Sequence, residues 1–209
     1  MTLGAVVPAA GLSRRMGREK VLLPFGRSTI LGTVLAKLAA SGVDRVVVVV
    51  RPDLGEAAAE ARASGADVVV NPHPEGEMLE SIALGASALP AEVDAFFVWP
   101  ADHPVVLEST LEKLAAKGAR GRVVLPVYRG RRGHPALVGA DLRASIAEMG
   151  GRGGLRQLWR DRAEAVDEMA VEDPGVVENL DEPDAYERAR SRESGSRFSG
   201  GPSGGTGVP

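Results

Sequence analysis

Two kinds of apolar pattern alternate along this chain. Short runs rich in valine, leucine and phenylalanine predict strands that are buried on both faces. These runs are Leu3–Pro8, Arg45–Val50, Asp67–Val70, Asp94–Trp99 and Arg122–Val127. Between them, apolar residues at spacings of three and four predict helices. The helical segments are Ser28–Gly42, with Ser28 as the possible N-cap, Glu56–Ala63, Met78–Leu89 and Leu107–Lys117.

Strands that alternate with helices in this way predict an α/β fold. The sheet is expected to be mostly parallel, with right-handed crossover connections. In such sheets ligands bind at the carboxyl ends of the strands. Residues that follow a predicted strand directly are therefore the first candidates for a functional site.

The regular alternation changes after Val127. The stretch "YRGRRGHPALVG" has a glycine-containing basic centre between two apolar runs, which predicts a β-hairpin or a loop with a return strand. Further elements are expected in this order: helices at Leu142–Met149 and Leu155–Arg160, a strand at Ala165–Val171, and a helix from Pro183 to about Arg190. Residues 191–209 are mainly glycine, serine and proline, so we expect a single domain over residues 1–190 followed by a disordered tail.

Composition limits the classes of partner. The 209 residues are 44% hydrophobic and carry a formal net charge of −3, so no overall basic field favours nucleic acid. The chain has no cysteine, which excludes disulfides and thiolate metal sites. No apolar stretch reaches the roughly 18 residues typical of a membrane span, and Met1 is followed at once by a predicted strand rather than by a signal peptide. We expect a cytoplasmic protein that binds neither nucleic acid nor membrane.

A local burst of positive charge follows the first predicted strand. In "VVPAAGLSRRMGREK", residues 6–20, the apolar run ends in Ala9, Ala10 and Gly11 and is followed by four basic residues. The basic residues are Arg14, Arg15, Arg18 and Lys20, with Glu19 as the one acid among them. The alternative to an anion site is a simple turn with a solvated basic face. Backbone N–H groups beside small residues, with Arg15 and Lys20 supplying charge, favour bound phosphate.

Two common phosphate-binding patterns do not fit this loop. Gly11 and Gly17 are separated by five residues, whereas a P-loop requires G-x-x-x-x-G-K-[ST] and a dinucleotide fold requires G-x-G-x-x-G. The absence of the second pattern disfavours a nicotinamide-dependent oxidoreductase.

The wording A-A-G-x-S-x-R-M-G-x-x-K at Ala9 to Lys20, followed by Leu22-Leu23-Pro24, resembles a family signature. It is similar to that of nucleotidyltransferases that activate molybdopterin, most closely the molybdenum cofactor cytidylyltransferases. The resemblance implies a Rossmann-like three-layer sandwich of the nucleotide-diphospho-sugar transferase type. It also implies that the loop binds a nucleoside triphosphate through Ala9, Ala10, Gly11, Ser13, Arg15 and Lys20, with Arg15 and Lys20 also catalytic.

Three other family landmarks occur in the expected order. Asp102 in "WPADHP" is implied to be a catalytic residue that binds Mg²⁺, and Asp181 in "NLDEPDAYERA" a second metal ligand. His134 in "RRGHPALVG" matches an element near the acceptor substrate. Without the resemblance, an aspartate after a strand is more often a turn or cap residue, and a lone histidine is more often structural. Asn179 stands where many relatives have aspartate.

Two further segments resemble the family more loosely. In "NPHPEGEMLESIALG", Asn71 and Ser81 are implied to help seat the base and ribose, and Gly85 also fits, but Glu77 replaces the family's glycine. In "GGRGGLRQLW", Gly151 replaces an acid, and a glycine-rich helix start is the alternative interpretation.

The resemblance implies a Mg²⁺-dependent nucleotidyltransferase. It would move CMP, with GMP as second choice, from CTP or GTP to the terminal phosphate of molybdopterin and release pyrophosphate. Ala9-Ala10-Gly11 resembles the cytidylyl branch, because guanylyl relatives usually carry A-G-G. The alternatives are transfer to a sugar phosphate or another small phosphate, and a non-catalytic nucleotide-binding or molybdoenzyme-assembly module. A molybdoenzyme is therefore a candidate protein partner.

Overall fold

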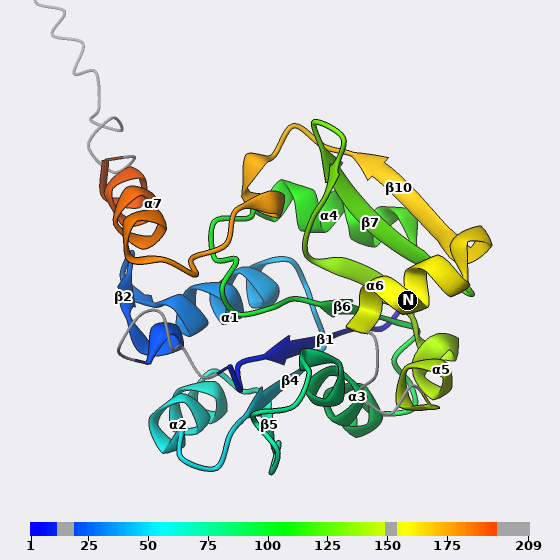
Figure 1. Ribbon diagram of the computed structural model, residues 1–209, viewed down its shortest axis with the longest axis horizontal. Helices are drawn as coiled ribbons and strands as arrows, with labels where there is room; N and C mark the ends of the chain where they lie inside the picture. Colours follow the sequence, from blue (N-terminus) through cyan, green and yellow to red (C-terminus); the bar gives the residue numbers. More distant parts are fainter. Residues whose placement is uncertain (12–18, 149–153, 196–209) are drawn as a thin grey trace, which may run out of the picture.

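The computed structural model describes residues 1–11, 19–148 and 154–195, and it is built on one central sheet (Figure 1). The strands lie in the order β10-β7-β9-β6-β1-β4-β5, and β8 pairs with β7 beside this path. β9 is antiparallel to both β6 and β7, and β8 is antiparallel to β7, while the other neighbours are parallel. A mostly parallel α/β fold is thus confirmed.

The bounds of the elements are as follows. The strands are β1 Leu3–Pro8, β2 Pro24–Phe25, β3 Ser28–Thr29, β4 Arg45–Val50, β5 Asp67–Val70, β6 Ala95–Val98, β7 Val123–Tyr128, β8 Arg131–Arg132, β9 Ala136–Gly139 and β10 Val166–Ala170. The α-helices are α1 Ile30–Ala40, α2 Gly55–Ala63, α3 Met78–Ala88, α4 Glu108–Lys117, α5 Arg143–Glu148, α6 Gly154–Asp161 and α7 Pro183–Gly195. The 3₁₀ helices are Lys20–Leu22, Ala140–Leu142, Ala163–Ala165 and Pro174–Val177.

Helices cover both faces of the sheet, which gives the three layers that the sequence predicts. Apolar residues of α1, α2 and α4 pack on one face, and those of α3, α5 and α6 pack on the other. Figure 1 shows α1 and α4 on one side of β1 and β6, with α3 and α5 on the opposite side. Successive residues of β1 alternate between the two cores, since Val7 belongs to the first and Val6 to the second. Both are fully buried, which explains the continuous apolar run in the sequence.

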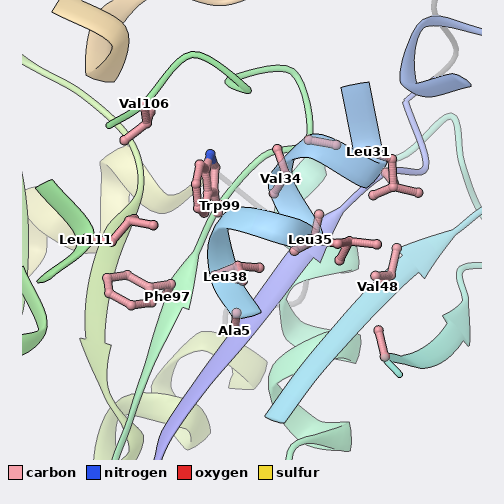
Figure 2. Close-up of a cluster of buried hydrophobic side chains, with 14 of the residues drawn as sticks. Ala5, Leu31, Val34, Leu35, Leu38, Val48, Phe97, Trp99, Val106 and Leu111 are labelled. Carbon is pink, nitrogen blue, oxygen red and sulfur yellow. The ribbon is translucent and has the colours of Figure 1, made fainter. Parts of the chain in front are cut away.

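The larger core surrounds α1. Figure 2 shows Leu31, Val34, Leu35 and Leu38 of α1 beside residues of the sheet and of α4. Trp99 lies in this cluster just beyond the end of β6 and is fully buried. Burial of so large a side chain stabilises the fold by about 3 kcal/mol and fixes where the chain leaves the sheet.

The chain's last helix packs on a small second sheet. β2 and β3 form a two-stranded antiparallel pair, and residues of α7 contact it through Phe25, Tyr186 and Ala189. The Tyr186 hydroxyl donates a 2.6 Å hydrogen bond to the Pro24 carbonyl. Leu180 is fully buried in the same cluster, so the segment before α7 is held against the body of the protein.

Three boundaries differ from the sequence prediction. The N-cap of α1 is Thr29 rather than Ser28, because the Thr29 hydroxyl accepts the Gly32 N–H while Ser28 belongs to β3. β2 and β3 were not predicted, since runs of two residues carry no periodic pattern. Helix α7 continues to Gly195, so the predicted start of the tail at residue 191 is wrong. Polar residues suit its exposed face, and Arg192 pairs with Glu178; residues 196–209 lie outside the described residues.

Two alternatives were predicted for the stretch after Val127, a β-hairpin and a loop with a return strand, and each describes part of the structure. β7 and β8 form a hairpin around Arg129 and Gly130, and β9 then returns between β6 and β7. In the described part of the chain, no helix is long and apolar enough to span a bilayer.

Candidate active site

A cavity of about 530 Å³ opens at the carboxyl end of the sheet. Its walls come from the segments that follow β1 and β6, from the loop between β5 and α3, and from the segment that begins at Lys20. The lining residues are Pro8, Ala9, Ala10, Gly11, Lys20, Val21, Pro74, Glu75, Gly76, Glu77, Met78, Ser81, Pro100, Ala101, Asp102 and Asp181. The cavity therefore lies where α/β proteins bind their ligands.

The wall after β1 is made of small residues held by the backbone. The Ala9 N–H donates to the Val49 carbonyl at 2.8 Å, and the Ala101 N–H donates to the Pro8 carbonyl at 3.3 Å. Ala9 and Ala10 are buried. A Cβ atom built on Gly11 would meet no atom of the described residues within 4 Å. Packing within the described protein thus does not require glycine at this position, and the missing side chain leaves room on the cavity side.

Lys20 joins two carboxylates at the edge of the cavity. Its Nζ lies 2.9 Å from Asp102 Oδ2 and 2.6 Å from Asp181 Oδ1. The Leu180 N–H donates to the Asp102 carbonyl at 2.9 Å, which brings the two aspartates side by side. Asn179 donates to the other oxygen of Asp181 at 2.7 Å. The sequence assigned no role to Asn179, and here it orients Asp181.

Charge and burial oppose each other at this cluster. Burial lowers the pKa of the Lys20 ammonium, but the two aspartates outweigh burial and the pKa lies above its ordinary value. Burial alone would raise the pKa of Asp102, whereas the Lys20 charge, with His103 nearby, brings it below the ordinary value. Both groups are therefore ionised at neutral pH, and the cluster carries a cation between two anions.

The two aspartates have the chemistry of a divalent-metal site. Asp102 Oδ1 is buried and accepts no hydrogen bond from the described residues, although His103 Nε2 lies 3.7 Å away, so this oxygen can take a further ligand. Within the described ranges, no group of three or more acidic or histidine side chains is arranged to hold a metal. Mg²⁺ commonly takes one or two carboxylates and completes its shell with substrate phosphates and water. Asp102 and Asp181 thus fit the metal that the sequence predicts.

Hydrogen bonds from Trp99 and from α1 hold the turn that carries Asp102. The buried Trp99 indole donates to the His103 carbonyl at 3.1 Å. Lys37 of α1 donates to the carbonyls of Pro104 and Val106 at 2.7 Å each. Neither Trp99 nor Lys37 was assigned a role from the sequence. Together they set the path of the chain on both sides of the turn that carries Asp102.

Asp173 connects this turn to the segment that carries Asp181. Its Oδ2 accepts hydrogen bonds from the Leu107 N–H and the Thr110 hydroxyl, and its Oδ1 accepts the Gly175 N–H, each at 2.8 Å. Asp173 is 3% exposed. A Cβ on Gly175 would lie 2.7 Å from the Val105 carbonyl oxygen, so the two segments touch through backbone. The sequence "EDPG" contains a turn signal at Asp173, but not its long-range partners.

His134 lies behind the site rather than in the cavity wall. The His134 ring is 4.9 Å from that of His103, and the His134 backbone N–H donates to the Val176 carbonyl at 2.7 Å. Burial lowers the pKa of His103, and the attraction of Asp102 only partly offsets this effect. His134 thus contacts His103, which in turn lies beside Asp102. A role of His134 in binding an acceptor stays a prediction.

Asn71 and Ser81 are brought together, although only Ser81 lines the cavity. The Asn71 amide donates to the Ser81 hydroxyl at 2.9 Å and accepts the His73 N–H at 2.8 Å. Asn71 thus shapes the loop before α3.

Gly85 lets α3 approach the sheet, because a Cβ there would lie 2.4 Å from Val6 Cγ1.

The remaining predicted residues of the loop, Ser13 and Arg15, lie outside the described residues, as does Gly151. Further contributions to the site were also missed from the sequence. The carboxylates of Glu75 and Glu77 add negative charge to the cavity wall. Arg51 contacts both Gly11 and Glu19, and its position directly after a strand was the signal that could have identified it.

Comparison with known proteins identifies the family. Residues 5–166 match the family described as "MobA-like NTP transferase domain". The molybdenum cofactor cytidylyltransferase of Escherichia coli (strain K12) is 27% identical over 193 residues, which cover 91% of this chain and 96% of that protein. The nicotine blue oxidoreductase of Paenarthrobacter nicotinovorans is 28% identical over 185 residues, which cover 84% of this chain and 90% of that protein.

Solved structures agree with this match. Rv0371C of Mycobacterium tuberculosis H37Rv, in a complex with manganese, superposes with a TM-score of 0.73 at 25% identity, covering 91% of this chain and 99% of that one. The family match spans most of the chain, and the matched range includes Lys20 and Asp102 but ends before Asp181. The chain belongs to the MobA-like NTP transferase family and is a nucleotidyltransferase of the MobA/cytidylyltransferase type.

Proposed function

We propose that the protein transfers CMP, with GMP as second choice, from a nucleoside triphosphate to the terminal phosphate of molybdopterin. The observation that carries the proposal is the contact of Lys20 with both Asp102 and Asp181 at the edge of the cavity. This arrangement places one cation and two potential metal ligands beside a wall of small residues. Such a set suits a polyphosphate and its metal better than it suits acyl transfer, which needs a nucleophile with an adjacent base.

The chain's own residues would first bind and orient the triphosphate. Ala9, Ala10 and Gly11 leave room for a ligand to approach the backbone, and Lys20 offers a point charge to phosphate oxygens. Asp102 and Asp181 would hold Mg²⁺. The ion supplies charge neutralisation on the phosphates when bound.

The transfer itself makes and breaks one bond each at the α-phosphorus. An oxygen of the acceptor's phosphate monoester bonds to the α-phosphorus, and the bond from that phosphorus to the bridging oxygen breaks, releasing pyrophosphate. The acceptor phosphate has a second pKa near 6, so it is largely dianionic at neutral pH. A general base is therefore not required. Lys20 stabilises the charge that grows on the phosphate oxygens.

Support for CTP comes from the side chain of Ala10. Ala10 is 5% exposed, so its methyl group is a fixed part of the cavity wall. Guanylyl relatives usually carry glycine at this place in the motif, and the added Cβ leaves less room beside the backbone. The relative from Escherichia coli named a molybdenum cofactor cytidylyltransferase supports the same acceptor and nucleotide.

The proposal is tested by pyrophosphate release from purified protein with Mg²⁺. CTP and GTP are each combined with molybdopterin and with a panel of sugar phosphates, and dissociation constants for CTP and GTP are measured by calorimetry. We expect the largest rate with CTP and molybdopterin. Clearly tighter binding of GTP would overturn the choice of base, and faster turnover with a sugar phosphate would overturn the choice of acceptor. Tight binding without pyrophosphate release from any pair would indicate a non-catalytic module.

An oxidoreductase is the second candidate, because the relative named nicotine blue oxidoreductase matches most of the chain. Loss of nicotine blue absorbance during incubation with the protein and a panel of electron donors, in the absence of oxygen, tests it. Such a loss, with no pyrophosphate release in the first assay, would favour this activity over the proposed transfer to molybdopterin.

A further inference from the structure

Arg51 is a buried cation directly after β4, and its side chain is 5% exposed. Each of its three nitrogens donates a hydrogen bond. Nε donates to Asp53 Oδ1 at 2.7 Å, Nη1 donates to the Gly11 carbonyl at 2.7 Å, and Nη2 donates to the Glu19 carboxylate. Neither the proposed chemistry nor the family motif uses this residue.

The two partners of Arg51 that are distant in the sequence, Gly11 and Glu19, both belong to segments that line the cavity. Gly11 ends the wall of small residues that follows β1, and Glu19 directly precedes Lys20. One guanidinium therefore connects the wall that would face a nucleotide with the residue next to the ammonium that would face its phosphates. Arg51 directly follows β4, which pairs with β1 on one side and with β5 on the other.

We propose that Arg51 is a positioning residue that holds Gly11 and Lys20 at a fixed separation for nucleotide binding. The inference rests on the proposed nucleotide site. A planar guanidinium can serve three acceptors in fixed directions, which a lysine ammonium on a flexible chain does not reproduce. Without this brace, the nucleotide itself has to hold Gly11 and Glu19 in place, and ordering of backbone and side chains opposes binding. Loss of Arg51 should therefore weaken nucleotide binding and leave acceptor binding unchanged.

A purely structural role for Arg51 predicts a different outcome. Removal of a buried hydrogen-bonded cation destabilises the fold wherever it occurs. Arg143, which is half-buried, provides the comparison, because its guanidinium donates to the carbonyls of Leu89, Pro90 and Val93, none of which lines the cavity. A loss of stability shared by both variants does not distinguish the two roles. A specific loss of nucleotide affinity does.

The experiment compares Arg51→Met, Arg51→Lys and Glu19→Gln with Arg143→Met and the unsubstituted protein. Calorimetry gives the dissociation constants for CTP and GTP, and steady-state pyrophosphate release gives KM separately for nucleotide and acceptor. We expect Arg51→Met to weaken nucleotide binding by about 10- to 100-fold, the scale of a small misplacement in a site. Arg51→Lys should recover only part of this loss, and acceptor KM should stay within about twofold. Arg143→Met should bind nucleotide normally.

The outcomes separate the role of Arg51 from the proposed function. Normal nucleotide affinity in folded Arg51→Met would overturn the inference while leaving the proposed function in place. If Arg51→Met does not fold, Glu19→Gln decides instead, because Glu19 is partly exposed and its substitution keeps the shape of the side chain. Unchanged nucleotide affinity in Glu19→Gln would then overturn the inference. Failure of the unsubstituted protein to bind either nucleotide would overturn the proposed function and this inference together.

Discussion

Asp181 Oδ1 lies 2.6 Å from the Lys20 ammonium. The segment before α7 therefore completes a charged cluster with Asp102 and with Lys20, the first residue of the 3₁₀ helix Lys20–Leu22. The contact depends on Leu180, which is buried and whose backbone N–H donates a hydrogen bond to the Asp102 carbonyl. The cavity's charged edge is therefore assembled from three distant segments, and each can be tested by a substitution.

Lys20→Ala should lower kcat for pyrophosphate release by about 10² to 10³ fold, the scale seen when one preorganised donor is lost. Nucleotide binding should weaken less, because the donor acts most strongly on charge that develops in the transition state. Steady-state kinetics and calorimetry measure the two effects separately. Lys113→Ala on the exposed face of α4 is the control and should match the unsubstituted protein. A normal kcat in folded Lys20→Ala would contradict the role of Lys20.

Asp102→Asn should reduce turnover and raise the concentration of Mg²⁺ needed for half-maximal activity. The amide keeps the shape of the side chain but removes the anionic ligand, and Lys20 keeps its contact with Asp181. Titration of activity with Mg²⁺ and with Mn²⁺ measures the shift, and a chelator should abolish activity in the unsubstituted protein. Glu112→Gln removes a carboxylate from α4, far from the cavity lining, and serves as the control. An unchanged metal requirement would exclude Asp102 as a ligand.

Much of the fold could be predicted from the sequence because the information is local. Apolar strands such as β1 and β4 are buried on both faces, and a continuous run of valines has few other interpretations. The α1 cap was misplaced by one residue because Ser28 and Thr29 are both good N-caps, and only the Gly32 contact decides between them. The two-residue strands of the small sheet owe their position to α7, which no local pattern encodes.

The charged residues of the candidate site could be predicted from the sequence, but the residues that support them could not. The motifs identified Lys20, Asp102 and Asp181, and the structure brings them together. The residues that hold them could not be inferred, since two of the three partners of Asp173, Leu107 and Thr110, are more than 60 positions away in the chain. A buried hydrogen bond across such a separation depends on the packed fold and leaves no mark in spacing or periodicity.

Gly11→Ala and Gly85→Ala should separate nucleotide binding from stability. The Cβ at residue 11 meets open space among the described residues, so stability should be unchanged while nucleotide affinity falls. The Cβ at residue 85 would be 2.4 Å from Val6 and 3.0 Å from Val49, so α3 must move and stability should fall by about 1–3 kcal/mol. Urea denaturation and calorimetry test both. Normal nucleotide affinity in Gly11→Ala would argue against a ligand beside this residue.

Asp173→Ala should destabilise the protein by about 2–4 kcal/mol, because three buried donors lose their acceptor at once. Thr110→Val removes one of these donors and should cost about 1 kcal/mol. Asp173→Asn should fall between them, since one amide oxygen cannot serve donors on both sides of the carboxylate. Urea denaturation gives the three values, with Glu112→Ala on the same helix as the control.

The same substitution should also affect catalysis through Asp181. Asp173 ties the 3₁₀ helix Pro174–Val177 to the start of α4, and the chain continues from that helix to Asp181. When the tie is lost, Asp181 is held less firmly against Lys20, and the Mg²⁺ requirement of folded Asp173→Asn should rise by a few-fold while acceptor KM stays constant. Activity titrated with Mg²⁺ below the unfolding temperature measures this. A lower stability with an unchanged Mg²⁺ requirement would mean that the segment before α7 is positioned by Leu180 and α7 alone.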